Sequence, residues 1–177
     1  VSHNMGSIQK LCPRAILIED GRIVKDDSAR VVVERYLASA HEAGSGMTWS
    51  DPASAPGNDK VRLHSVRVLS EDGESARELD MAKEIVIQFS YWCLQEGTRL
   101  RSCINVRDRM GHLFLSSINA PSASLRADEW FRRPHPVGLY RSECRLTANF
   151  LNEGTYSVTP IVAIDDVDGS TMANILA

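Results

Sequence analysis

The chain has 177 residues, 43% of them hydrophobic and 24% charged, which is enough for one domain with a real core plus a small appendage. Its 20 basic and 23 acidic side chains give a net charge of −3. This near balance argues against a nucleic-acid binder, which needs a basic surplus on one face. The sequence has no run of about 18 apolar residues that could span a bilayer. Its first residues lack the basic and apolar regions of a signal peptide.

Residues 1–41 have a mixed α/β pattern. A short helix is expected over residues 7–11, because Pro13 stops it. Residues 15–24 predict a hairpin around Asp20-Gly21, and Ser28 is placed to cap a second helix. This region is too small to fold alone as an α/β unit.

Residues 42–59 are rich in Gly, Ser, Ala and Pro, a composition typical of a linker. Trp49 interrupts this composition. A tryptophan in a linker favours docking onto a neighbouring domain over free exposure, because its large apolar ring gains from burial.

From residue 60 to 177 helical periodicity disappears, and alternating β-rich runs are separated by turns that contain glycine. The pattern predicts an antiparallel Ig-like or jelly-roll β-sandwich. Residues 119–138 form a long irregular connection of the Greek-key kind. The expected strands are 61–69, 84–94, 100–106, 112–117, 139–150 and 156–164. Two hairpins are expected, one from strands 100–106 and 112–117 and one from strands 139–150 and 156–164.

The expected strand 84–94 carries a candidate ligand-binding face. Alternation places Ile85, Ile87, Phe89, Tyr91 and Cys93 toward the core, and leaves Gln88 and Trp92 on the other side. Sugars bind to an aromatic face ringed by planar polar groups, so Trp92 is a candidate stacking platform. If the next strand is a neighbour, Gln88, Trp92, Asn105 and Arg107 form one carbohydrate-binding patch. The alternative is that Trp92 is a buried sandwich tryptophan and the polar residues only coat the surface.

Two other clusters of charged and aromatic residues are better explained by structural roles than by ligand binding. Arg141, Glu143 and Arg145 indicate a solvated strand face more than a binding rim. Arg132-Arg133 next to Trp130 and Phe131 favours a loop anchored by its aromatics over an RNA-stacking site.

Metal and catalytic sites are not expected. Residues 165–169 (Asp-Asp-Val-Asp-Gly) resemble the start of a calcium loop, but the later ligands are missing and an Asp-Gly turn is favoured. No second carboxylate is placed to make a glycosidase pair. His64, His112 and His135 lack ligand spacing, and the four cysteines lack C-x-x-C spacing, so we expect reduced thiols and no metal.

Two stretches carry a family resemblance. Val1–Met5 and Ile8–Val24 resemble the end of an ABC transporter ATPase domain, in which His3 matches the switch-loop histidine that contacts the γ-phosphate of ATP. The downstream half resembles the C-terminal carbohydrate-binding domain of Wzt-type ATP-binding subunits of polysaccharide (O-antigen) ABC exporters. The matching residues there are Tyr91-Trp92, Ile104-Asn105, Asp108, Gly111–Phe114 and Asn149–Tyr156.

The resemblance implies three parts: residues 1–41 as an ATPase remnant, 42–59 as a linker and 60–177 as the sandwich. The chain lacks the phosphate-binding G-x-x-x-x-G-K-[ST] loop, the signature motif and the Walker-B carboxylate, so we expect no ATP hydrolysis and no cofactor in this chain. ATP and magnesium would bind the complete parent. We expect a fragment truncated at both ends.

The implied function is recognition of a cell-surface polysaccharide, so that the attached ATPase couples export to the right cargo. The implied partners are the polysaccharide, the transmembrane permease subunit and a second copy of the chain, with no nucleic acid. The implied location is the cytoplasmic face of the bacterial inner membrane. A non-catalytic dimerisation domain that binds no sugar is the main alternative, and a glycan-acting enzyme is a remote one.

Overall fold

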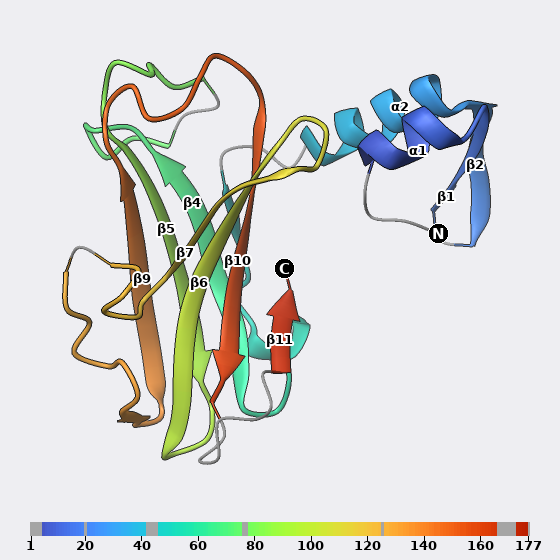
Figure 1. The fold of residues 1–177 in the computed structure, drawn as a ribbon. Helices are drawn as coiled ribbons and strands as arrows, with labels where there is room; N and C mark the ends of the chain where they lie inside the picture. Colours follow the sequence, from blue (N-terminus) through green and yellow to red (C-terminus); the bar gives the residue numbers. More distant parts are fainter. Residues whose placement is uncertain are drawn as a thin grey trace.

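The computed structural model describes residues 5–19, 21–41, 46–75, 78–124, 126–165 and 173–176. For residues 37–41 and 173–176 only the backbone is described. The elements of the first part are α1 (Met5–Leu11), β1 (Arg14–Glu19), β2 (Arg22–Ser28) and α2 (Ala29–His41). β1 and β2 form an antiparallel hairpin (Figure 1). Val32 and Val33 of α2 are buried. These elements confirm the expected helix–hairpin–helix order. No helix in the described part is long and apolar enough to cross a membrane.

The rest of the described chain forms a β-sandwich of two antiparallel sheets, which confirms the expected fold class. One sheet has the order β3-β4-β5-β9 and the other β11-β10-β6-β7, with β8 paired to one end of β6 (Figure 1). The strands are β3 (Gly46–Thr48), β4 (Val61–Leu69), β5 (Ile85–Cys93), β6 (Thr98–Asp108), β7 (Leu113–Ile118), β8 (Pro134–His135), β9 (Gly138–Leu146), β10 (Tyr156–Ile164) and β11 (Ala173–Leu176).

Strand alternation determines which side chains fill the space between the sheets. Residues 85, 87, 89, 91 and 93 of β5 are all buried in the core, as their alternation predicts. Leu100, Ile104 and Val106 of β6 and Val162 of β10 meet them from the opposite sheet. Burial of these aliphatic and aromatic side chains holds the two sheets face to face.

The hairpin expected between residues 139–150 and 156–164 is wrong in its pairing. β9 pairs with β5, whereas β10 pairs with β6, so the chain crosses from one sheet to the other between β9 and β10. The chain also crosses between β5 and β6. A period of two defines which side of a strand faces the core, but it carries no information about which strand lies alongside. The expected hairpin of β6 and β7 is confirmed.

Residues 46–59, which the composition assigns to a linker, lie on the sandwich. β3 pairs with β4, and a short 3-10 helix (η1, Pro52–Ser54) follows it. Trp49 packs against the core, which confirms the expected docking. The guanidinium of Arg62 fastens the segment, because it donates to the carbonyl oxygens of Ala55 at 2.8 Å and Asn58 at 3.0 Å.

A glycine makes this close approach possible. Gly57 has a φ of +148°, and a Cβ at this position would lie 2.3 Å from the carbonyl oxygen of Val61. Only glycine fits there, because any side chain would collide with the first residue of β4. The loop therefore lies directly against the end of the sheet.

Candidate functional site

The four residues expected to bind carbohydrate do not lie together. Gln88 and Trp92 are on β5 and Asn105 and Arg107 on β6, and these strands belong to different sheets. In each strand the intervening residues are buried between the sheets, so the two pairs lie on opposite outer faces of the sandwich. A single patch of all four residues is therefore excluded. The error follows from the wrong assumption that β5 and β6 are neighbours.

Trp92 lies on the outer face of the β3-β4-β5-β9 sheet, half-buried and outside the core cluster, as the alternation predicts. The reading of Trp92 as a buried sandwich tryptophan is wrong. Its ring meets His64 edge to face, with the ring centroids 4.7 Å apart. Leu139, its partner on β9, is 54% exposed. This arrangement offers a small apolar platform on a flat sheet face.

Gln88 lies two positions away on the same face and is already engaged. Its side-chain amide donates to Glu143 at 2.9 Å, and Arg145 donates to both Glu143 and Glu84. The hydrogen bond from Gln88 and the charge of Arg145 hold the pKa of Glu143 below its usual value. Glu143 and Arg145 thus belong to a hydrogen-bonded network on the strand face, whereas Arg141 makes no ion pair in the described part of the chain.

Asn105 and Arg107 face outward from the other sheet. The guanidinium of Arg107 donates to the carbonyl oxygen of Gly111 at 3.2 Å, so it braces the turn between β6 and β7. Asn105 lines a shallow depression with Cys103, Ser116 and Ile161. The described residues that line the depression include no aromatic side chain. They are Arg101, three short polar side chains and three apolar ones, so a sugar ring would find no stacking platform there.

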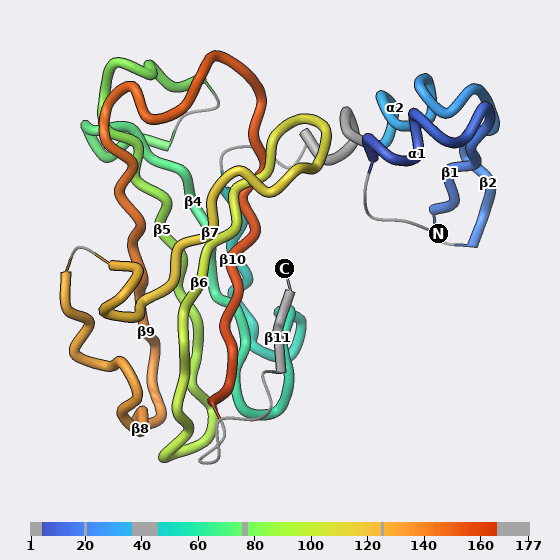
Figure 2. The backbone as a smooth tube through the Cα atoms, in the orientation of Figure 1, coloured from blue at the N-terminus to red at the C-terminus, as the bar shows by residue number. Residues whose placement is uncertain are grey.

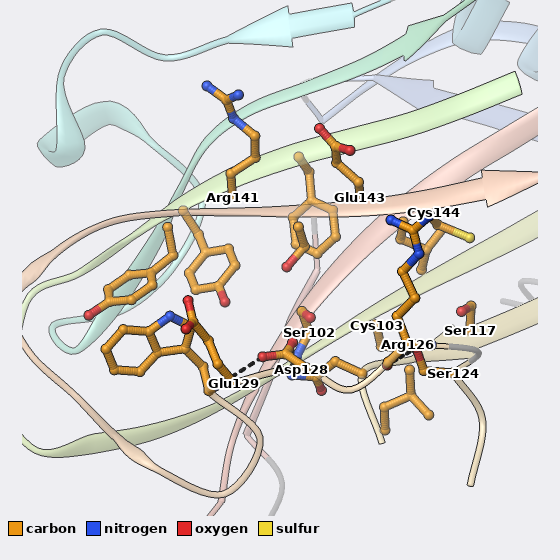
Figure 3. Close-up of a pocket in the computed structure, with 18 of the residues that line it drawn as sticks. Ser102, Cys103, Ser117, Ser124, Arg126, Asp128, Glu129, Arg141, Glu143 and Cys144 are labelled. Atoms are coloured by element: carbon orange, nitrogen blue, oxygen red, sulfur yellow. Dashed lines mark hydrogen bonds between the residues drawn. The ribbon is translucent and has the colours of Figure 1, made fainter. Parts of the chain in front are cut away.

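A cleft of about 590 Å³ lies at the open side of the sandwich. It lies between the edge strands β7 and β9, and its outer wall is formed by Asn119, Ser124 and residues 126–130. Figure 2 shows the backbone that leads to β8 and β9 beside β9. Three kinds of side chain line it: aromatic, hydroxyl or amide, and charged (Figure 3). The aromatic side chains are Phe89, Tyr91, Trp130 and Tyr140. The polar and charged side chains include Ser102, Asn119, Ser124, Arg126, Asp128, Glu129, Arg141, Ser142 and Glu143.

Stacked aromatic rings form one side of the cleft. Tyr91 and Tyr140 stack with centroids 5.9 Å apart, and Trp130 meets Tyr140 edge to face at 5.2 Å. His135 lies behind them, 1% exposed, with its ring 5.1 Å from Trp130 and 4.8 Å from Tyr140. Burial raises the pKa of Tyr91 to about 12, so its hydroxyl stays protonated and can donate a hydrogen bond.

The wall loop is tied to the sandwich by an amide and a carboxylate. Asn119 accepts from the backbone N–H of Ser102 at 3.2 Å and donates to Asp128 at 2.9 Å. The other carboxylate oxygen of Asp128 accepts from the backbone N–H of Trp130 at 2.7 Å. These hydrogen bonds hold the loop in place and position Trp130 at the cleft.

Sequence reasoning identified Trp130 as an anchor of its loop, which the ring contacts confirm, but it missed the cleft that the anchoring creates. One signal was available. A connection of about twenty residues without regular structure is unusual in a compact domain and is often functional. This one also carries a tryptophan with charged side chains on both sides of it.

The other sequence candidates add no site. His3 and residues 166–169 lie outside the described residues, so neither the switch-loop assignment nor the Asp-Gly turn is placed. Within the described ranges no three His, Cys, Asp or Glu side chains gather in a way that could hold a metal ion. The four cysteines are free thiols.

Comparison with known proteins shows a likeness in the fold. No protein-family model matches the sequence, and no curated protein matches it. Among solved structures, the chain is similar to one described as the crystal structure of the C-terminal domain of Wzt. The TM-score is 0.52 and the identity 11%, over 67% of this chain and 68% of that one. The sandwich therefore has the fold of that domain, as the resemblance implied.

Proposed function

We propose that this chain is a carbohydrate-recognition module that binds a polysaccharide in the cleft between β7 and β9. The observation that supports the proposal is the cleft itself, which combines aromatic rings with hydroxyl, amide and carboxylate groups. Sugar rings present C–H faces that stack on aromatic side chains, and hydroxyl pairs that bond to planar polar groups. The likeness to the Wzt C-terminal fold is consistent with it.

The finer parts of the proposal rest on the sequence resemblance. In this proposal the module belongs to the ATP-binding subunit of a polysaccharide ABC exporter and reports cargo identity to an attached ATPase. A permease subunit at the inner face of the bacterial inner membrane would be the transport partner. A second copy of the chain would raise the avidity of a shallow, weak site.

Trp92 is a second candidate platform for the same function. Its neighbour Leu139 is exposed, and its position beside His64 gives a flat apolar surface. A single stacked ring on a flat face contacts one side of a sugar, whereas the cleft can surround it. We therefore place the main site in the cleft, and the two locations are separated by variants.

The test is calorimetric titration of the chain with a panel of purified O-antigen-type polysaccharides. We expect saturable binding to one member of the panel and a loss of about tenfold in Trp130→Ala, as removal of an aromatic contact of about 1–1.5 kcal/mol gives. Trp92→Ala is the matched control and should bind as the wild type does.

The opposite pattern, loss in Trp92→Ala alone, would keep the function and move the site to the outer face. If the folded chain binds none of the polysaccharides in the panel, the proposed function is contradicted and a structural dimerisation domain is favoured. Circular dichroism and thermal unfolding of each variant establish that it is folded.

A further inference from the structure

The charged side chains of the cleft fall into two groups, committed and uncommitted. Asp128 is committed, because one carboxylate oxygen accepts from Asn119 and the other from the backbone of Trp130. Glu143 is also committed, since Gln88 and Arg145 both donate to it. Among the described residues that line the cleft, Arg126, Arg141 and Glu129 remain, and none of them forms an ion pair with another described residue.

The backbone of Arg126 is held by hydrogen bonds, whereas its guanidinium makes no ion pair with another described residue. The hydroxyl of Ser124 accepts from the backbone N–H of Arg126 at 3.3 Å and donates to its carbonyl oxygen at 2.8 Å. From this anchored point the side chain rises from the wall loop across the cleft toward β9, near Cys144 (Figure 3). The guanidinium is not held by these backbone bonds, so it is available to a ligand, and binding has to offset the side-chain freedom that is lost.

The two other uncommitted groups define the local balance of charge. Arg141 extends on the outer side of β9, away from the wall loop, so it lies at the rim (Figure 3). Glu129 lies on the wall loop near Asp128. Two cations and one carboxylate are therefore available to a ligand, in a chain whose net charge is −3.

We propose that the cleft selects an acidic saccharide unit, a uronic-acid type of sugar, whose carboxylate is bound by Arg126 while its ring lies against the aromatic side. The planar fork of a guanidinium matches a carboxylate with two parallel hydrogen bonds. The inference deepens the proposed function and rests on it. Arg141 adds attraction at the rim, and Glu129 opposes the ligand's charge and limits the affinity.

The test compares pairs of oligosaccharides that differ in one group. Oligomers of galacturonic, glucuronic and mannuronic acid are titrated into the full chain by calorimetry, together with the same oligomers after reduction of the carboxyl groups to alcohols. We expect at least one acidic oligomer to bind about tenfold more tightly than its reduced counterpart, as a charge-assisted bond gives. This preference should shrink between about 50 and about 300 mM salt.

Variants separate the contact from general charge. Arg126→Gln should lose the preference and keep the affinity for the reduced oligomer. Glu129→Gln should raise the affinity for the acidic oligomer about twofold, because the opposing charge is gone. Arg14→Gln, which makes the same change of charge in the β1–β2 hairpin at a residue that does not line the cleft, is the control and should change neither.

Three results would overturn the inference. Equal binding of acidic and reduced oligomers would remove acid selection and leave the glycan-binding function standing. Binding of dextran sulfate as tight as that of the best acidic oligomer, with no effect of Arg126→Gln, would show attraction of any polyanion. Binding of no uronic oligomer by a chain that binds a neutral polysaccharide would limit the cleft to neutral sugars, whereas binding of no saccharide at all would contradict the proposed function as well.

Discussion

The hydroxyl of Tyr140 donates a 2.9 Å hydrogen bond to the carbonyl oxygen of Pro136, four residues before it. Tyr156 repeats the arrangement with the carbonyl oxygen of Asn152 at 3.2 Å, and each ring lies near a glycine two residues earlier. Both tyrosines stand at the start of a strand and fold the preceding loop back onto it. This is the tyrosine-corner device of β-sandwiches. The one at Tyr140 also positions a ring of the cleft.

Tyr140→Phe should lower the free energy of unfolding by about 1 kcal/mol, because it removes one hydrogen bond and keeps the ring. Tyr156→Phe is the matched variant at the other corner and should cost a similar amount. Denaturant unfolding followed by tryptophan fluorescence measures both. If the proposed site is right, only Tyr140→Phe should also weaken glycan binding. An equal effect of the two variants on binding would argue that Tyr140 acts through stability alone.

Arg101 and Asp165 form the most enclosed ion pair in the described part of the chain. Two guanidinium nitrogens contact the carboxylate, at 2.6 and 3.2 Å, and the side chains are only 24% and 14% exposed. Asp165→Asn should cost about 1–2 kcal/mol of unfolding free energy, since it weakens a partly buried charge pair.

The control for this pair is Asp26→Asn. Asp26 pairs with Arg14 at 2.6 Å, but these side chains are 34% and 71% exposed. An exposed pair contributes little, so we expect a much smaller loss of unfolding free energy than from Asp165→Asn. Thermal unfolding of both variants at low and high salt checks the comparison. Equal losses from the two pairs would contradict the importance assigned to burial.

Buried His135 makes stability depend on pH. Burial lowers its pKa below the usual value, because the charged ring would lose its hydration among Trp130 and Tyr140. Its Nδ1 lies 3.0 Å from the carbonyl oxygen of Arg133. Arg133 and Asp128 are charged groups of the same loop, and Cys93 lies on the opposite side against the His135 backbone.

The sign of the effect follows from the lowered pKa. The folded state favours the neutral ring, so the contribution of His135 to the free energy of unfolding is fully present above the pKa of about 6.5 that a histidine has in the unfolded chain. This contribution is lost as the pH falls below that value. Unfolding free energies measured from about pH 8 to about pH 5 should therefore fall more steeply in the wild type than in His135→Gln. Parallel curves for the two proteins would contradict this role of His135.

Much of the fold could be predicted from sequence because strand formation is local. The alternation of apolar side chains in residues 61–69 and 156–164 matches β4 and β10 at both ends. The inward set of β5 was identified for the same reason. Pairing of strands was beyond such reasoning, because β5 and β9 are brought together by contacts between residues far apart in the chain.

The candidate site depends on that long-range assembly. Tyr91 and Tyr140 come from neighbouring strands, and Trp130 comes from the loop that crosses beside them. Each of them alone looks like an ordinary core or loop aromatic. Their common cleft follows only from the pairing of β9 with β5 and from the Asn119–Asp128 bond that fixes the loop. Sequence reasoning therefore found the individual residues without the site.

The most direct test of the account uses the indole N–H signals of the three tryptophans, which report on three places in the sandwich. Trp130 lines the cleft, Trp92 lies on an outer face and Trp49 packs beside β3. A nitrogen–proton correlation spectrum is recorded during titration with the polysaccharide that binds, after Trp→Phe variants assign each signal. We expect the Trp130 signal to shift saturably while the other two stay in place. A shift confined to Trp92 or Trp49, with Trp130 unmoved, would contradict recognition in the cleft.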